Sequence, residues 1–437
     1  MRISVIGCGY LGAVHAASMA KLGHDVVGID VDERKITDLQ AGRAPFFEPG
    51  LPELLTEVQE TGRLSFSTDM AAAEGAQVHF VCVGTPQRKG EYAADLTYVD
   101  AAFTELIPYL HEGDIAVGKS TVPVGTAARL AEAVAAGAPG AVLAWNPEFL
   151  REGHAVKDTL TPDRFVYGVP EGAAGEAATS ALDEVYATPL SDDTPRLVVD
   201  YATAELVKTA ANSFLATKIS FINAMAEICA ATGADVTALA DAIGMDDRIG
   251  RKFLNAGVGF GGGCLPKDIR AFMARAGELG ADQALTFLRE VDDINMRRRS
   301  RVVELTRELV GGSLIGKRVT VLGAAFKPNS DDVRDSPALS VAAQLQLQGA
   351  TVTVTDPEAL DNAKLRFPEL SYEPDLKKAL YNAHALVLLT EWDQYKGMDP
   401  VETGSLVDEQ NILDGRNVLD PASWRAAGWN YRGIGRP

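Results

Sequence analysis

Short apolar runs alternate with longer helix-like segments from the first residue of this chain. The runs at 3–6, 25–29, 78–83 and 115–118 each have the length of a buried strand, and segments with helical character separate them. Regular alternation of this kind is typical of a parallel sheet whose helices cover both faces. The sequence therefore predicts an α/β fold of the Rossmann-like, doubly wound type.

The alternation occurs twice, on either side of a long segment without glycine or proline. That segment, Tyr201 to Thr232, predicts one helix of about 45 Å, since an α-helix rises 1.5 Å per residue. Its apolar residues lie on more than one face, so we expect it to pack between domains or to build a homodimer. Gly311-Gly312 then precedes a second alternating region. The predicted parts are two Rossmann-like parallel-sheet domains, 1–198 and 313–437, joined by a central helical region, 199–312.

Charge and cysteine usage restrict the partners and the compartment. Acidic residues outnumber basic ones by 60 to 41, and a formal charge of −19 repels phosphate backbones and anionic membranes. The longest apolar runs are far shorter than the roughly 18 residues of a membrane span. We expect no nucleic-acid partner, no membrane insertion and no disulfide framework, and hence a reducing, cytoplasmic location. The four cysteines are Cys8, Cys82, Cys229 and Cys264.

The first candidate site is a glycine loop between a predicted strand and a predicted helix. Gly7-x-Gly9-x-x-Gly12 has the spacing of a dinucleotide-binding turn, in which the glycines allow a tight bend, close approach of the pyrophosphate and helix packing. Asp30 ends the next strand, where such folds place an acid on the ribose hydroxyls. A carboxylate there repels a 2′-phosphate, although Arg34 lies nearby. The loop predicts NAD rather than NADP.

The second candidate site is a cysteine in a glycine-rich loop, residues 257–268. Pro266 suits the first turn of a helix, so Cys264 should lie at the helix N-terminus, where the dipole favours a thiolate. Asp268 lies on the same face and could relay a proton, although its charge opposes the thiolate. A reactive thiol beside an NAD site predicts oxidation past the aldehyde, through a thiohemiacetal and a thioester that water hydrolyses.

These motifs occur together with several others in an order that spans nearly the whole chain. They resemble the UDP-glucose/GDP-mannose dehydrogenase family. The segments that carry the resemblance are 83–86, 120–126, 146–153, 205–212, 259–268, 326–327, 331–334 and 390–392.

The resemblance implies a two-step, four-electron oxidation of the sugar C6 alcohol to a carboxylate, with UDP-glucose giving UDP-glucuronate. It implies that Cys264 is the nucleophile, that Lys208 and Asn212 stabilise the oxygen at C6, and that Thr121 and Asp268 hold a catalytic water. Glu152 would act as general base in thioester hydrolysis. No metal is expected.

The resemblance also assigns binding roles. The first domain would bind NAD, and the C-terminal domain would bind the UDP-sugar, because its loop Gly323-Ala324-Ala325 lacks an intact glycine fingerprint. Arg248 would reach the substrate of the neighbouring subunit. The cofactor residues would be Gly7, Gly9, Tyr10, Leu11, Gly12, Asp30, Lys35, Thr85, Pro86, Thr121, Glu148 and Arg334. The substrate residues would be Phe149, Leu150, Arg151, Glu152, Lys208, Asn212, Arg248, Phe260, Gly261 and Lys327.

Several alternatives remain open at this stage. GDP-mannose or a UDP-N-acetylhexosamine could be the substrate, although Pro162-Asp163-Arg164 favours UDP-glucose over GDP-mannose and 146–152 argues against acetamido sugars. A non-catalytic NAD-binding regulator would need no cysteine loop. Lys208 and Asn212 could face solvent, and Arg151 and Glu152 could form a surface ion pair. The basic run Arg297-Arg298-Arg299 with Arg301 could be a polyanion patch, but we expect it to be a solvated helix face. Gly263 stands where many relatives have serine.

Overall fold

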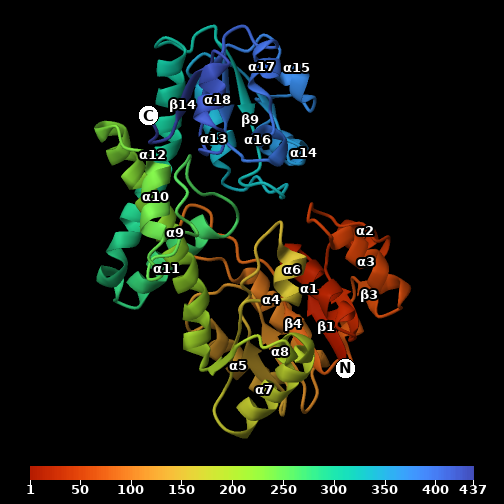
Figure 1. Cartoon of the computed structure of the whole chain (residues 1–437). Coiled ribbons are helices and arrows are strands. Elements are labelled where there is room, and N and C mark those ends of the chain that lie inside the picture. Colours follow the sequence, from red (N-terminus) through yellow and green to blue (C-terminus); the bar gives the residue numbers. More distant parts are fainter. The chain divides into compact units, whose positions relative to one another are not determined.

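The computed structural model describes all 437 residues, which form two compact units. The first unit comprises Met1–Ala211 and Arg270–Leu279, and the second comprises Asn212–Ile269 and Gly280–Pro437. Each unit contains one sheet (Figure 1). Residues of the central region 199–312 therefore contribute to both units, and the long helix α9, Tyr201–Thr232, continues from the first into the second.

The sheet of the first unit has eight strands in the order β3-β2-β1-β4-β5-β6-β7-β8. All neighbours are parallel except β6 and β7. Val5 packs into one core and Ile6 into another, because successive side chains of a strand point to opposite faces. The strands are β1 Arg2–Ile6, β2 Asp25–Ile29, β3 Leu64–Ser67, β4 Val78–Val81, β5 Ile115–Gly118, β6 Val142–Trp145, β7 Phe165–Gly168 and β8 Arg196–Val199.

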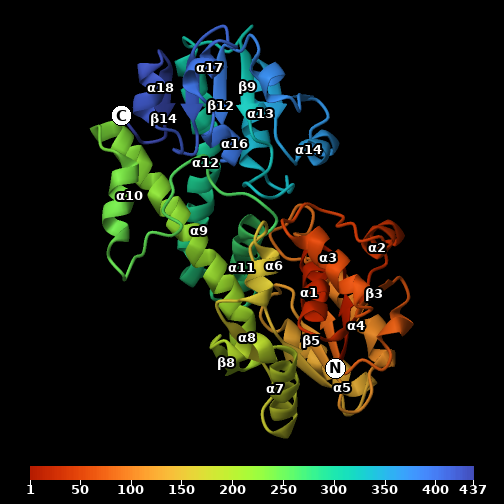
Figure 2. The same cartoon turned by 45° about the vertical axis from the view of Figure 1, so that its right-hand side comes forward.

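Helices cover both faces of this sheet, and α1 packs beside α3 on one of them (Figures 1 and 2). The helices are α1 Tyr10–Lys21, α2 Glu33–Gln40, α3 Leu51–Glu60, α4 Thr97–Leu106, α5 Thr126–Gly137, α6 Ala155–Leu160, α7 Ala173–Val185 and α8 Ala187–Ser191, with 3₁₀ turns at Met70–Ala73 and Ile107–Tyr109.

The second unit has a six-stranded parallel sheet in the order β11-β10-β9-β12-β13-β14. This order, counted from the first strand of the unit, is the one typical of dinucleotide-binding folds. The strands are β9 Arg318–Leu322, β10 Thr351–Thr355, β11 Ser371–Tyr372, β12 Ala385–Leu388, β13 Asn411–Asp414 and β14 Asn430–Gly433. The remaining helices are α10 Val236–Gly244, α11 Leu265–Glu278, α12 Thr286–Leu309, α13 Pro337–Leu347, α14 Leu360–Arg366, α15 Leu376–Leu380, α16 Asp393–Lys396, α17 Pro400–Gly404 and α18 Pro421–Ala426, with a 3₁₀ turn at Asp282–Leu285.

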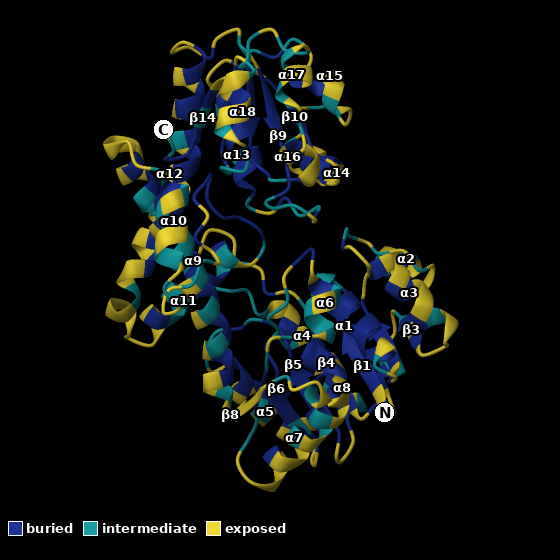
Figure 3. Cartoon of the chain, viewed as in Figure 1, coloured by how far each residue is buried: buried dark blue, intermediate teal, exposed yellow.

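The predicted fold class is confirmed: two Rossmann-like, largely parallel sheets and a long central helix are present. The central strands of both sheets are buried, whereas the edge strand β8 and the outer helix faces are exposed (Figure 3). The prediction of a solvated arginine face on α12 is wrong for two residues. Arg298 is 2% exposed and pairs with Glu227, and Arg299 is 4% exposed and pairs with Asp335.

Helix α9 is long and apolar enough to cross a membrane by length and composition alone. That indication is weak, because the core helix of a soluble protein passes the same test. Glu205, Lys208 and Asn212 are buried on α9, and charged side chains are costly inside a bilayer. These residues argue against a membrane span.

Candidate active site

The glycine loop lies between β1 and α1, which begins at Tyr10. Gly7 has φ +88°, and a Cβ there would lie 2.7 Å from a Val83 methyl carbon. A Cβ at Gly12 would lie 1.8 Å from the Gly7 carbonyl oxygen. By contrast, a Cβ at Gly9 would meet no heavy atom within 4 Å. The first and third glycines are therefore required by local packing, and the space beside the second suits close approach of a pyrophosphate.

Asp30 is held beside this loop by three donors. Its carboxylate accepts hydrogen bonds from the Cys8 amide at 2.7 Å, the Lys35 ammonium at 2.8 Å and the Asp32 amide at 3.0 Å. The group is 9% exposed, so its position is fixed. The loop and this carboxylate together fit NAD, with Gly9 beside the pyrophosphate and Asp30 beside the ribose hydroxyls.

This geometry predicts a strong preference for NAD over NADP. We expect kcat/KM with NAD to exceed that with NADP by at least about tenfold, because the Asp30 carboxylate repels a 2′-phosphate. Initial rates with each cofactor measure the ratio. Asp30→Ala should lower it, whereas Glu33→Gln, at an exposed carboxylate on α2, should not. Equal kcat/KM values for the two cofactors in the unmodified enzyme would contradict the assignment.

The loops that follow the neighbouring strands β4 and β5 are joined by hydrogen bonds from side-chain hydroxyls. The Thr85 hydroxyl donates to the Thr121 carbonyl at 2.8 Å, and the Ser120 hydroxyl donates to the Val83 carbonyl at 2.6 Å. Thr85 is buried and Pro86 is exposed. The predicted cofactor residues Thr85 and Thr121 are therefore in direct contact.

Glu148 and Lys208 form an ion pair in the first unit, in which Lys208 is buried and Glu148 is partly buried. The Lys208 ammonium lies 3.2 Å from one Glu148 oxygen, and the other oxygen accepts from the Leu150 amide at 2.6 Å. The same ammonium is 5.6 Å from the centre of the Phe149 ring. Lys208 and Asn212, one turn further on, are 6% and 8% exposed. The alternative that this face of α9 is solvated is wrong.

Arg151 and Glu152 lie in different environments: Arg151 is exposed and Glu152 is buried. Arg151 pairs with Asp158 at 2.7 Å, which raises the pKa of the guanidinium through the hydrogen bond. Glu152 is 9% exposed. The alternative of a surface ion pair between Arg151 and Glu152 is disfavoured, because Arg151 pairs with Asp158 on α6 and Glu152 is largely buried.

A buried lysine that the sequence did not single out supports the start of this segment. The Lys119 ammonium donates to the Asn146 side-chain oxygen at 3.0 Å, which also accepts from the Tyr186 hydroxyl at 2.8 Å. Burial lowers the pKa of Lys119 to about 8. Lys119 directly precedes the Ser120-Thr121 loop, so it connects that loop to the beginning of segment 146–153.

Cys264 is placed as the helix signal predicts, immediately before α11. It is exposed, whereas Cys8, Cys82 and Cys229 are buried, and burial raises the pKa of Cys82 to about 12. None of the four cysteines forms a disulfide bond. Cys264 therefore differs from the other cysteines in both position and access.

Asp268 lies one turn into α11 and is 2% exposed. Its amide donates to the Cys264 carbonyl at 3.0 Å, and one carboxylate oxygen accepts from the Asn212 side-chain amide at 2.7 Å. Lys267 pairs with the other oxygen. Cys264, Asp268 and Asn212 thus belong to one group in the second unit, with Lys267 as a member that the sequence analysis missed.

Two of the glycines before Cys264, Gly261 and Gly262, are required by close packing in the second unit. A Cβ at Gly261 would lie 2.3 Å from the Asp335 carbonyl oxygen, and one at Gly262 would lie 2.7 Å from the Phe326 ring. At Gly263 a Cβ would lie 2.2 Å from the central guanidinium carbon of Arg334. The Arg334 guanidinium thus occupies the space beside Gly263, and it is the end of a flexible side chain that could move aside for a serine.

Arg416, a second residue that the sequence analysis missed, fastens this loop to the C-terminal sheet. Its guanidinium donates to the carbonyls of Gly259 at 3.2 Å, Phe326 at 3.2 Å and Leu389 at 2.7 Å. It follows β13 in a segment that carries no motif of its own. Only the folded chain brings it beside the cysteine loop.

The other predicted substrate residues of the second unit are placed as follows. Lys327 lies 5.2 Å from the Phe326 ring centre. Phe260 and Gly261 are buried in the cysteine loop. Arg334 pairs with Asp332 at 2.7 Å. The Arg248 side chain is 88% exposed and pairs with Asp246.

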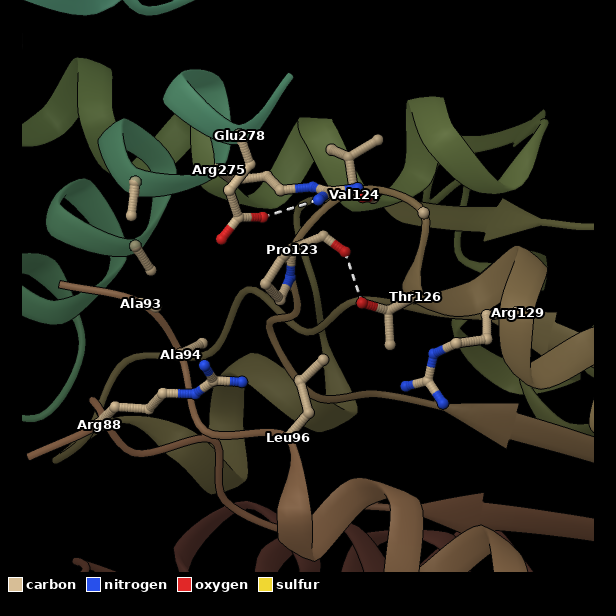
Figure 4. Close-up of a pocket in the computed structure, with 13 residues that line it drawn as sticks. Arg88, Ala93, Ala94, Leu96, Pro123, Val124, Thr126, Arg129, Arg275 and Glu278 are labelled. Atoms are coloured by element: carbon tan, nitrogen blue, oxygen red, sulfur yellow. Dashed lines mark hydrogen bonds and ion pairs between the residues drawn. The ribbon is translucent and has the colours of Figure 1, made fainter. Parts of the chain in front are cut away.

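A hollow of about 270 Å³ in the first unit contains none of the predicted site residues (Figure 4). Three arginines line it, and each pairs with a carboxylate: Arg88 with Glu91, Arg129 with Asp100 and Arg275 with Glu278. Each of the three positive charges therefore already has a partner of opposite charge. We assign no function to this hollow.

Comparison with known sequences identifies the chain. It matches the NAD binding, central and UDP binding domains of the UDP-glucose/GDP-mannose dehydrogenase family over residues 1–189, 202–297 and 320–421. The chain belongs to this family. It is an NAD-dependent dehydrogenase, and its resemblance to the family is confirmed over all three domains.

Its relatives cover the full length of the chain. It is 41% identical to a UDP-glucose 6-dehydrogenase of Rhizobium meliloti over 100% of both chains, and 40% identical to UDP-glucose 6-dehydrogenase TuaD of Bacillus subtilis over 100% of this chain and 93% of that protein. Among solved structures, a UDP-glucose dehydrogenase from Pyrobaculum islandicum is 39% identical with a TM-score of 0.90, covering 100% of this chain and 98% of that one. A UDP-D-ManNAc dehydrogenase from Pyrococcus horikoshii is 27% identical with a TM-score of 0.87, covering 100% and 99%.

Proposed function

We propose that this dehydrogenase oxidises UDP-glucose at C6 to UDP-glucuronate with two molecules of NAD. The observation that carries the proposal is Cys264, an exposed thiol at the start of α11 beside the Asn212–Asp268 pair. The relatives at about 40% identity that are named UDP-glucose 6-dehydrogenases support this choice of sugar. The segment Pro162-Asp163-Arg164 also favours UDP-glucose over GDP-mannose.

The first oxidation converts the C6 alcohol to an aldehyde. Bound NAD supplies the hydride acceptor for this oxidation and for the next. Lys208 and Asn212 stabilise the oxygen at C6 as negative charge develops on it, and a water held by Asp268 and Thr121 takes the hydroxyl proton. The buried contact with Glu148 orients the Lys208 ammonium.

The second oxidation passes through Cys264. The sulfur adds to the aldehyde carbon, and the carbonyl oxygen takes a proton to give a thiohemiacetal. Loss of a second hydride and of that proton gives a thioester. Glu152 then takes a proton from water, the new C–O bond forms, and the C–S bond breaks to regenerate the thiol. One sugar nucleotide, two NAD⁺ and one water give one carboxylic acid, two NADH and two protons.

A substrate screen tests the proposed sugar. The enzyme is mixed with NAD and UDP-glucose, GDP-mannose or UDP-N-acetylmannosamine, and NADH is followed by absorbance. We expect kcat/KM for UDP-glucose to be at least about a hundredfold above the others, because a site built around a substrate's hydroxyls discriminates strongly. A higher kcat/KM for GDP-mannose or for UDP-N-acetylmannosamine would instead make that sugar nucleotide the substrate. If none of the three sugar nucleotides gave NADH, the alternative of a non-catalytic NAD-binding regulator would be favoured.

We also propose a homodimer built through α9. Phe214, Phe221 and Ile228 recur every seven residues on α9 and are 66%, 47% and 58% exposed. A stripe of large apolar side chains at helical spacing is suited to an identical helix of a partner. Arg248 would then reach the partner's substrate. We also propose a reducing, cytoplasmic location, which cysteines without disulfide bonds favour and which fractionation of cells would test.

Light scattering tests the dimer. At micromolar concentration we expect twice the 46.4 kDa mass of the chain. Phe221→Asp should yield the monomer mass, because it buries a charge in the interface. Leu365→Asp, at an 84% exposed leucine on α14, is the matched control and should remain dimeric. A monomeric unmodified protein would rule out the dimer.

A further inference from the structure

Glu48 is a buried carboxylate in the segment between α2 and α3. It is 2% exposed. One carboxylate oxygen accepts from the Gly153 amide at 2.6 Å, and the other accepts from the Ala155 amide at 2.7 Å. The Tyr10 hydroxyl donates to the oxygen that binds Gly153. Glu48 therefore contacts the residue that directly follows Glu152.

These hydrogen bonds fix the backbone of the Glu152 turn. Hydrogen bonds to an ionised carboxylate are about twice as strong as neutral ones, and burial of a carboxylate without such partners costs several kcal/mol. Gly153 has φ +76°, and the His154 amide closes the turn on the Arg151 carbonyl at 2.9 Å. A tight turn held by a buried carboxylate leaves the Glu152 side chain little freedom of position.

The other contact of Glu48 leads to the cofactor loop. Tyr10 is the first residue of α1 and follows Gly9 directly. Its ring packs against Phe46 at 4.7 Å between centres, and its hydroxyl lies 2.9 Å from the Gly153 amide. Glu48 and Tyr10 thus join the loop expected to hold NAD to the turn that carries Glu152.

We propose that Glu48 is a positioning residue that holds Glu152 for thioester hydrolysis, with Tyr10 fixing the Glu48 carboxylate. The inference rests on the proposed function, in which Glu152 is the general base. Glu48 need not touch the sugar. Its carboxylate accepts from two backbone amides, whereas a glutamine would offer one acceptor oxygen and turn an NH₂ group toward the second amide.

The test compares Glu48→Gln with Glu53→Gln, an exposed glutamate on α3. In Glu48→Gln we expect both hydride transfers in the first turnover, followed by a steady-state kcat lower by about 10- to 100-fold, the scale for a misplaced catalytic group. Intact-protein mass spectrometry should show a thioester on Cys264, and the Kd for NAD should stay unchanged. Tyr10→Phe should give a smaller effect in the same direction if Glu48→Gln folds poorly.

Two results would overturn the positioning role. One is a Glu48→Gln enzyme with the kcat of Glu53→Gln. The other is a variant in which hydride transfer and turnover fall together without an adduct, as loss of folded enzyme would produce. The Glu152→Gln variant, measured in parallel, distinguishes failure of the inference about Glu48 from failure of the proposed role of Glu152 in hydrolysis. An adduct there but not in Glu48→Gln rejects only the inference about Glu48, whereas no adduct in Glu152→Gln rejects the hydrolysis role itself.

Discussion

Replacing Cys264 with serine should lower steady-state production of UDP-glucuronate by at least about a thousandfold, a loss within the range seen when a covalent nucleophile is removed. An unactivated hydroxyl at this position is a poor nucleophile, and an ester leaves less readily than a thioester. The substitution changes an exposed side chain at the start of α11, so the fold and NAD binding should persist. Product is measured by chromatography, and NAD binding by calorimetry.

The matched control for this variant is Cys229→Ala, which removes a buried thiol from the same unit. We expect it to retain a kcat within about twofold of the unmodified enzyme, with at most a small loss of stability from the cavity. If Cys264→Ser formed the acid at a near wild-type rate, Cys264 would be a structural residue of the glycine loop.

Glu152→Gln should stop the reaction later, at the thioester. Both hydride transfers should occur, but kcat should fall by about 100-fold or more, the usual contribution of a general base. Glutamine keeps the size of the side chain and cannot accept the proton from water. A UDP-glucuronyl adduct on Cys264 should therefore accumulate and be visible by mass spectrometry.

Glu176→Gln, at an exposed carboxylate on α7 of the same unit, is the control for charge removal and should turn over normally. A Glu152→Gln enzyme that released acid at the wild-type rate would assign the base to another residue. A variant that lost the first hydride transfer would place Glu152 in an earlier step.

Local patterns in the sequence were sufficient for the fold. The predicted bounds of β2, β5 and α9 agree with the structure, because turn-forming residues such as Gly23 and Gly233 terminate the neighbouring segments. Short strands such as β7 and β8 were not predicted. β7 runs antiparallel to β6 and β8 is an exposed edge strand, so neither follows the pattern of buried parallel strands on which the prediction relied.

Long-range contacts at the site could not be predicted in the same way. Glu48 precedes Gly153 by 105 positions, and nothing in the sequence around it signals that contact. Buried Arg298 and Arg299 were misassigned because a run of arginines has the same composition whether its partners are water or carboxylates. Gly263 looked like a minor departure from the family until the guanidinium of Arg334 was found in the space beside it.

The ratio of NADH formed to UDP-glucose consumed tests the central claim most directly. The unmodified enzyme is given limiting UDP-glucose and excess NAD, and NADH absorbance is compared with the sugar nucleotides separated by chromatography. The covalent, two-step reaction at Cys264 predicts two NADH per UDP-glucose, UDP-glucuronate as the product and no free aldehyde. One NADH per sugar, with the C6 aldehyde released into solution, would contradict it.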